Sequence, residues 1–173
     1  MTEGPQASRV VRPTSCLHGE FGWVDCQAME GRVVSVRRKI RRQEMEEATC
    51  LELSPSGIEG DYHYGHPTRQ VLLLDQRTLS EFGYQPGELR EQILLDFENL
   101  QTLKPGTQLQ VGTSTLQITF DCAPCKTMAG YVGEEADSFI SKMTGRRGML
   151  ARVVGPGTVK PGDVARVTWN GGE

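Results

Sequence analysis

The stretch "TQLQVGTSTLQITF", residues 107–120, indicates the fold class. Its apolar residues alternate with polar ones on both sides of a glycine, which is the period of a β-strand with one buried face. A short glycine-containing connection between two such runs is typical of a β-hairpin. The stretch therefore predicts a hairpin that lies on a hydrophobic core. The alternating apolar residues are Leu109, Val111, Leu116, Ile118 and Phe120.

Three further segments also have the character of strands. Residues 31–40, "GRVVSVRRKI", are rich in β-branched side chains, and residues 71–74, "VLLL", form a continuous apolar run. Residues 149–169, "MLARVVGPGTVKPGDVARVTW", contain two apolar runs separated by Gly-Pro turns. We expect strands in all three segments, two of them in the last.

Helical patterns are short. Residues 75–83 start with Asp75, a suitable N-cap, and end with a glycine, and residues 134–145 place Ala136, Phe139, Ile140 and Met143 on one face. Residues 86–100, "PGELREQILLDFENL", fit a helix and a strand equally well. Since strands dominate and helices do not alternate strictly with them, the pattern predicts a mostly β protein, a β-barrel with short helical insertions.

The chain length of 173 residues suits a single domain, and 20 glycines indicate many tight turns. The formal net charge of -3 offers no electrostatic reason to expect nucleic acid or a membrane as a partner. No run of apolar residues is long enough for a transmembrane helix, and the first thirty residues lack a secretory pattern. The expected location is therefore the cytoplasm, and the basic-then-acidic run over 37–47 is expected to be a solvated strand end.

Five cysteines in a chain of this size do not indicate a disulfide framework, so reduced thiols are expected. Cys16 and Cys26, with His18 between them, match no zinc spacing and lie in an irregular N-terminal arm, residues 1–28. The folded domain is expected to span residues 29–170.

The segment "DCAPCK", residues 121–126, contains the thiol of greatest interest. The cation of Lys126 and an adjacent helix start would favour the thiolate of Cys125, the form that attacks sulfur or binds a metal. Cysteine also packs as a small apolar residue, so both roles remain open. A thioredoxin fold is not expected, because glycines soon interrupt the following segment, and one CxxC pair alone does not make a four-cysteine zinc site.

Residues 57–69, "GIEGDYHYGHPTR", combine glycines that let a backbone approach a ligand with polar side chains, among them Asp61, His63 and Arg69. His66 is expected to be solvated. The "GRRG" of residues 145–148 adds Arg146 and Arg147, whose guanidinium groups suit phosphate. Together these segments indicate a pocket for a phosphate-bearing ligand.

In order along the chain, these pieces resemble the MOSC domain, the C-terminal domain of molybdenum cofactor sulfurase, in its small stand-alone bacterial form. The similarity covers roughly residues 30–168. The matching pieces are "GIEGDYHYG", "RQVLLLD", "PGELRE", "LKPGTQLQVG", "CAPCKTM", "GRRGMLARVV" and "GTVKPGDVARV".

The resemblance implies a β-barrel-rich fold with a pocket for the molybdenum cofactor, a pterin-dithiolene that carries a phosphate. Cys125 is then the catalytic cysteine and the molybdenum ligand, and Arg69, Arg146 and Arg147 hold the phosphate. His63 and Lys126 are also expected at the cofactor. Gln92 takes the place of an asparagine of the family, with its amide one methylene further out, whereas Asn99 falls after that position. Binding of pyridoxal phosphate is not expected.

Three functions follow from these expectations. The leading one is reduction of N-hydroxylated compounds at a cysteine-ligated molybdenum, with electrons from another protein, because the chain has no flavin or iron-sulfur motif. The second is a carrier that receives a persulfide on Cys125 from a cysteine desulfurase and delivers sulfur to a metal-sulfur centre, since a thiolate suits both roles. The third is a binding module without catalysis.

Overall fold

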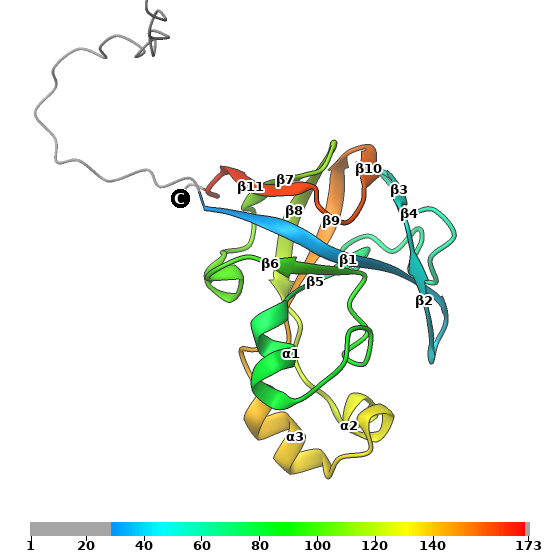
Figure 1. The fold of residues 1–173 in the computed structure, drawn as a ribbon, viewed down its shortest axis with the longest axis vertical. Helices are drawn as coiled ribbons and strands as arrows, with labels where there is room; N and C mark the ends of the chain where they lie inside the picture. The colour runs from blue at the N-terminus through cyan, green and yellow to red at the C-terminus, as the bar shows by residue number, and fades with distance from the viewer. Residues whose placement is uncertain (1–28, 172–173) are drawn as a thin grey trace, which may run out of the picture.

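The computed structural model describes residues 29–171 of the protein. Its strands gather at one end of the molecule and its three α-helices at the other (Figure 1). The strands are β1 (Glu30–Arg41), β2 (Glu44–Ala48), β3 (Leu51–Ser54), β4 (Gly57–Ile58), β5 (Val71–Asp75), β6 (Ile93–Asp96), β7 (Gln108–Val111), β8 (Ser114–Asp121), β9 (Met149–Gly155), β10 (Gly157–Val159) and β11 (Val164–Trp169). The helices are α1 (Gln76–Phe82), α2 (Lys126–Val132), α3 (Ala136–Met143) and a 3-10 helix (Leu100–Thr102).

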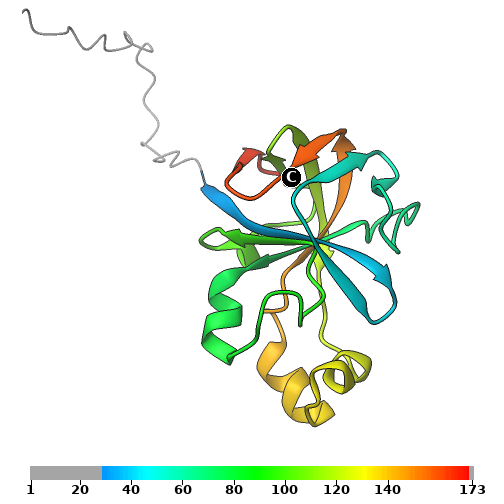
Figure 2. The same ribbon diagram turned by 45° about the vertical axis from the view of Figure 1, so that its right-hand side comes forward.

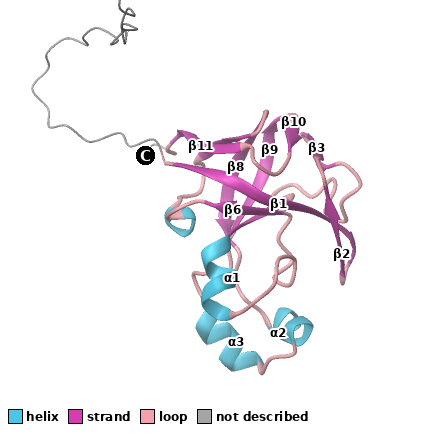
Figure 3. Cartoon of the chain, in the orientation of Figure 1, coloured by secondary structure: helices cyan, strands magenta, loops and turns pink. Residues whose placement is uncertain are grey.

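Seven strands close into a barrel in the order β1-β6-β5-β9-β8-β7-β11, and β11 pairs with β1 to complete the ring. All neighbours in this ring are antiparallel except β5 and β6, which are parallel. β2 continues the sheet beyond the barrel, and β3, β4 and β10 form a small second sheet. Figure 3 shows the strands and helices as separate regions. The expected β-barrel with short helical insertions is confirmed.

The predicted hairpin is β7 and β8, with Leu109 opposite Leu116. The side chains of Leu109, Leu116 and Ile118 are buried in the barrel core. A register shift between Ile118 and Phe120 ends the alternation, so Phe120 packs outside the barrel, in the small cluster of Leu72, Cys122 and Leu150. The strict two-residue period thus holds for the hairpin up to this irregularity.

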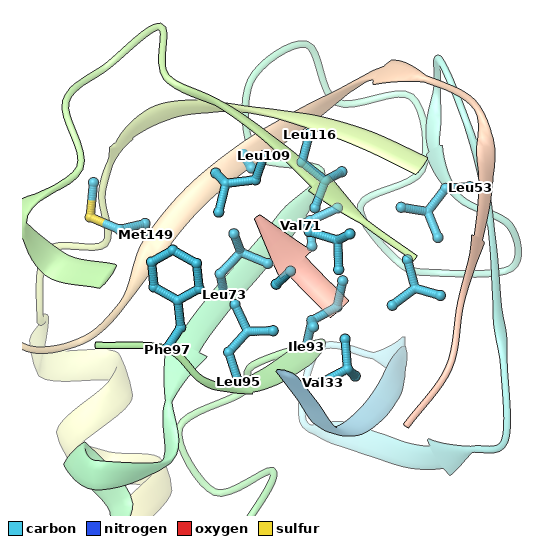
Figure 4. Packing of buried hydrophobic residues seen from close by; sticks show 14 of the residues in the cluster. Val33, Leu53, Val71, Leu73, Ile93, Leu95, Phe97, Leu109, Leu116 and Met149 are labelled. Atoms are coloured by element: carbon cyan, nitrogen blue, oxygen red, sulfur yellow. The ribbon is translucent and has the colours of Figure 1, made fainter. Parts of the chain in front are cut away.

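Strands β5 and β6 are buried on both faces. Their residues Val71, Leu73, Ile93 and Leu95 point into the barrel, where Figure 4 shows them together with Leu109 and Leu116. Leu74 and Leu94 lie on the opposite face, in the core of the helical end. This two-sided burial explains the unbroken apolar run at 71–74. It also decides the ambiguous segment 86–100 in favour of a strand over residues 93–96.

The helices form a second core against the outer face of β5 and β6. Asp75 caps α1 by accepting a hydrogen bond from the Arg77 amide, and Gly83 ends that helix in the left-handed conformation. In α3 the expected inward residues Phe139 and Met143 are fully buried, and they share a core with Leu79 of α1 and Met128 of α2. Figure 2 shows α2 and α3 side by side beneath the barrel, and the two helices are in contact.

Two segments contain more strands than the sequence indicates. Residues 44–58 form β2, β3 and β4, and residues 149–169 form three strands because β10 pairs with β3. The basic-then-acidic run over 37–47 is the β1–β2 hairpin. Its charges face each other across the two strands, as ion pairs of Arg37 with Glu47, Arg38 with Glu46 and Arg41 with Glu44.

The N-terminal arm, with Cys16, His18 and Cys26, lies outside the described residues, and the domain boundary at residues 29–170 stays a prediction. Within residues 29–171, no helix has the length and apolar composition needed to cross a lipid bilayer.

Candidate functional site

A pocket of about 680 Å³ opens beside the end of the barrel that faces the helices. Five separate parts of the chain form it: the β1–β2 hairpin, the loop before β5 with the start of that strand, the segment before β6, the connection from β8 into α2, and the segment that leads into β9. Its lining residues are Lys39, Arg42, Tyr62, His63, Arg69, Leu72, Arg90, Gln92, Cys122, Ala123, Pro124, Cys125, Thr127, Met128, Tyr131, Arg147 and Leu150. The predicted residues Cys125, His63, Arg69, Gln92 and Arg147 therefore share one cavity.

Cys125 lies immediately before α2 and is exposed at the pocket wall. Its backbone is extended, with φ −145° and ψ 163°, and its carbonyl accepts the first helical hydrogen bond from the Ala129 amide at 3.0 Å. Residues 122–125 contain neither a turn nor helix. The CxxC pair is therefore not arranged as in a redox motif, where the first cysteine precedes a helix that contains the second.

Cys122 is the buried thiol of the same pocket, with 7% of its surface exposed. Burial raises the pKa of the Cys122 thiol, and the positive charges of Arg147 and Arg69 partly offset this effect. Its sulfur accepts a hydrogen bond from Nη1 of Arg147. The Cys122 thiol is thus a packed partner of an arginine, whereas Cys125 is the accessible thiol.

Arg147 is buried, although arginine is rarely so. Besides the contact with Cys122, its Nη2 donates to the Leu89 carbonyl at 3.2 Å. Its Nε is also buried, and it has no hydrogen-bond partner among the described residues. A buried donor without a partner is costly unless a ligand or water accepts from it.

Asp61 organises the loop that precedes β5. Its carboxylate accepts hydrogen bonds from the backbone amides of His63, at 2.8 Å, and Lys39, at 2.7 Å. Burial raises the pKa of Asp61, but hydrogen bonding with His63, Lys39 and Gln92 outweighs burial and holds that pKa below its ordinary value. Asp61 therefore stays ionised at neutral pH, and its charge fixes the position of His63.

Gln92 links this loop to the barrel. Its Oε1 accepts from the Leu72 amide at 2.8 Å, and its Nε2 lies 3.4 Å from both carboxylate oxygens of Asp61. The amide expected at the cofactor is thus engaged at both ends within the protein. Gln92 borders the pocket mainly as a brace between β5 and the loop.

The pocket lining contains five cationic side chains and, within the described chain, no aspartate or glutamate. Arg90, which the sequence did not single out, is one of them, and it has a left-handed backbone with φ 67°. Its guanidinium donates to the Gln43 carbonyl at 2.7 Å and the Arg42 carbonyl at 2.6 Å, and it lies over the Tyr131 ring. Arg90 thereby holds the β1–β2 hairpin against the pocket.

Lys39 and Arg42, also absent from the predicted site, extend from that hairpin into the lining. Burial lowers the pKa of Lys39, and the charge of Arg90 lowers it further. The alternation of side chains along β1 could have indicated that residues 37 and 39 share a face. However, only the tertiary fold determines that Lys39 points to a cavity.

Two predicted site residues lie outside the pocket lining. Lys126 is exposed on the first turn of α2. Arg146 is also exposed, and its Nη1 lies 2.5 Å from Oε1 of Glu81, with the guanidinium over the Phe82 ring. The two arginines of "GRRG" therefore do not converge on one phosphate, because adjacent residues here point to different sides of the segment.

His66, which was expected to be solvated, is half-buried, and its Nδ1 accepts hydrogen bonds from the amides of Thr68 and Arg69. This shapes the turn that presents Arg69 to the pocket. The Arg69 guanidinium lies over the Phe120 ring, with 5.6 Å between its central carbon and the ring centroid.

Comparison with known proteins gives a family match from the sequence and a likeness of fold from solved structures. The family model of the MOSC domain matches residues 60–166, more than half of the chain. The fold is similar to that of the YuaD protein from Bacillus subtilis, with a TM-score of 0.70 at 19% identity over 82% of this chain and 97% of that one.

The YiiM protein from Escherichia coli has a TM-score of 0.63 at 19% identity, over 82% of this chain and 72% of that chain. YiiM from Geobacillus stearothermophilus has a TM-score of 0.61 at 16% identity, over 82% and 76%. A search of curated proteins gives no match. From the family model and the closed barrel that carries this pocket, we conclude that the chain belongs to the MOSC domain family.

Proposed function

We propose that this pocket binds the molybdenum cofactor and that the protein reduces N-hydroxylated compounds there, with Cys125 as the ligand of the metal. The observation that supports the proposal best is the charge of the lining. Five cations and no carboxylate of the described chain border a cavity in a protein whose overall charge is -3. Such a local excess of positive charge suits a ligand with a phosphate group.

The residues of the pocket fit this cofactor in chemistry and in size. A cavity of about 680 Å³ lies in the usual range for cofactor sites. Arg69 and Lys39 line the pocket, and the buried Nε of Arg147 has no acceptor among the described residues, so these groups would hold the phosphate and the pterin. The exposed thiol of Cys125 would ligate the metal, since thiolates bind soft metals well. When bound, the cofactor would supply two-electron redox chemistry.

The test is the metal and pterin content of protein purified from a host that makes the cofactor. We expect molybdenum and pterin fluorescence in the wild type and a strongly reduced metal content in Cys125→Ser. Cys50→Ser is the matched control, because Cys50 is also free and exposed but does not line the pocket. A folded wild-type preparation without molybdenum and pterin would refute the proposal.

The phosphate contact has a separate test. We expect Arg69→Gln to lower the pterin content, whereas Arg152→Gln should leave it unchanged. Arg152 is an exposed arginine whose guanidinium bonds to Gln117, away from this pocket. Equal pterin contents in the two variants would count against a phosphate at Arg69.

A persulfide carrier is the second candidate, and the accessibility of Cys125 supports it, because a donor protein must reach the sulfur that it loads. In this role the Cys125 thiolate takes the outer sulfur from a persulfide of a cysteine desulfurase. Intact mass after incubation with such an enzyme should show one added, reducible sulfur that Cys125→Ser abolishes. If Cys125→Ser keeps full cofactor affinity, and if the wild type gains no sulfur, a binding module without catalysis is preferred.

The reductase would require electrons from an external donor protein.

The cytoplasm is the proposed location, since its reducing conditions would preserve the thiols on which the site depends. In agreement with this, Cys50, Cys122 and Cys125 are all free within the described residues.

A further inference from the structure

We infer that His63 is the proton donor of this site and that the buried carboxylate of Asp61 orients it. This inference rests on the proposed reductase function. It assigns to His63 a role in the reaction, rather than the cofactor contact that the sequence predicts.

The geometry of the pair supports the assignment. Nδ1 of His63 is buried and faces Asp61, with 3.6 Å between Nδ1 and Oδ1, and the Asp61 side chain is fully buried. The His63 ring itself lines the pocket and is 29% exposed. Nε2 makes no hydrogen bond within residues 29–171, and this atom is not buried. One nitrogen thus faces a carboxylate, and the other is free for a ligand.

An ionised carboxylate 3.6 Å from Nδ1 favours the tautomer with the proton on Nδ1. Asp61 can maintain this charge because the amides of His63 and Lys39 hold its carboxylate. The neighbouring ring of Tyr62 packs edge-on against the His63 ring, with 5.5 Å between the two ring centroids, and this contact limits rotation of the imidazole. Nε2 is therefore presented in a defined direction.

The proposed reaction needs such a group. Converting N–OH to N–H breaks the N–O bond, consumes two electrons from the external donor and two protons, and releases the oxygen as water. The lining within the described chain has no carboxylic acid. Imidazole is the side chain that ordinarily exchanges protons nearest neutral pH, so His63 is the best-matched acid of the pocket. It would give one proton to the leaving oxygen and be reprotonated from solvent.

The first test compares His63→Gln with Arg152→Gln in cofactor-loaded protein, with benzamidoxime as substrate and reduced methyl viologen as electron donor. We expect His63→Gln to lower kcat about 100-fold, with KM and molybdenum content nearly unchanged. Arg152→Gln changes an exposed side chain that bonds to Gln117 away from the pocket, so kcat should persist. A loss of molybdenum in His63→Gln would instead indicate a cofactor contact and overturn the inference.

The second test distinguishes a proton donor from a structural residue. Free imidazole should restore part of the activity of His63→Ala, and it should not affect Cys125→Ser. We expect Asp61→Asn to lower kcat about tenfold, and nitrogen NMR of the full chain should show His63 protonated at Nδ1 only when Asp61 is present.

The outcomes separate this inference from the proposed function. Full activity in His63→Gln, or a His63 protonated only at Nε2, refutes the proton-donor role and leaves the reductase intact. Molybdenum-loaded wild type that reduces no N-hydroxylated compound refutes the reductase, and the inference falls with it.

Discussion

At the scale of single residues, two buried carboxylates near the pocket respond to their surroundings in opposite directions. Asp61 accepts several hydrogen bonds, whereas Glu91 accepts one from the Gly87 amide and leaves its Oε2 without a partner among the described residues. Burial raises the pKa of Glu91, and the Gly87 amide and the charges of Arg37 and Arg147 do not cancel this effect. The two side chains should therefore give opposite dependences of stability on pH.

For Asp61 the folded-state pKa lies below the unfolded value of 3.8. Its charge therefore stabilises the fold above that value, and the stabilisation is lost as the pH falls through the folded-state pKa. We expect Asp61→Asn to lower the free energy of unfolding by about 1–3 kcal/mol at pH 7. Urea unfolding should show that the gap in free energy of unfolding between the variant and the wild type narrows below about pH 4. A gap that is the same at pH 7 and pH 3 would contradict this account.

For Glu91 the folded-state pKa lies above the unfolded value of 4.5. The favourable contribution of the Glu91 side chain to stability is therefore present at pH values below the unfolded-state pKa. It is lost as the pH rises through the folded-state pKa. Glu91→Gln keeps an acceptor for the Gly87 amide without the charge. We expect the free energy of unfolding of this variant to rise, relative to that of the wild type, by about 1 kcal/mol between pH 4 and pH 8. Glu98→Gln, at an exposed position, is the control and should show no such change.

These residue roles were only partly predictable. Asp61, His63 and Arg69 stand out because polar residues and glycines crowd one loop. Arg90 and Lys39 do not, since their positions depend on contacts between β1 and the segment before β6, far apart in the sequence. Gln92 was found through the family resemblance, but its hydrogen bonds to Leu72 and Asp61 follow only from the tertiary fold.

At the scale of elements, the two glycines of "GRRG" have different roles. A Cβ at Gly148 would lie 2.2 Å from the Leu73 carbonyl oxygen of β5, and Gly148 also has φ +88°. The Gly148 amide donates to Oε1 of Gln101, so it is not free for a phosphate. Gly145 has φ +70°, but a Cβ added there would meet no atom within 4 Å. The first glycine serves a turn and the second allows β9 to start against β5.

This difference gives a matched pair of variants. We expect Gly148→Ala to destabilise the protein by more than about 3 kcal/mol, because the backbone of β5 must shift as well as the turn. Gly145→Ala should cost about 1–2 kcal/mol, the penalty of a left-handed conformation alone. Urea unfolding of both variants measures the difference. Equal losses would show that contact with β5 is not what requires a glycine at 148.

The elements themselves were predicted unevenly. The hairpin β7–β8 and helix α1 carry strong local patterns, an alternation in one and two caps in the other. Strand β2, "EMEEA", has no fully buried side chain, so it lacks the apolar period on which such a prediction depends. It forms because its acidic residues face the basic residues of β1.

At the scale of the whole molecule, the barrel closes where β11 meets β1. Ala165 is fully buried at this junction and pairs with Gly31 on one side and Val111 on the other. A barrel as such was predicted from the predominance of strands and from the family resemblance. The order of its strands was not, because it depends on long-range pairings that no local pattern encodes.

We expect Ala165→Asp to prevent folding, since an unpaired charge at this position costs an amount comparable to the whole stability of a domain. Arg166→Gln, on the next residue, should change the free energy of unfolding by less than about 1 kcal/mol, because its ion pair with Glu30 is exposed. Near-ultraviolet circular dichroism of the purified variants measures this. A native spectrum for Ala165→Asp would show that the junction is not essential.

The walls of the pocket come from segments that are distant in sequence, from Lys39 to Leu150. These walls meet only after β1 has paired with β6, and β5 with β9. A complete pocket therefore exists only after most of the chain has folded, so we expect the proposed cofactor to be loaded in a late maturation step. We expect the form without the proposed cofactor to be folded and stable, and cells depleted of that cofactor should accumulate this empty form rather than degrade it.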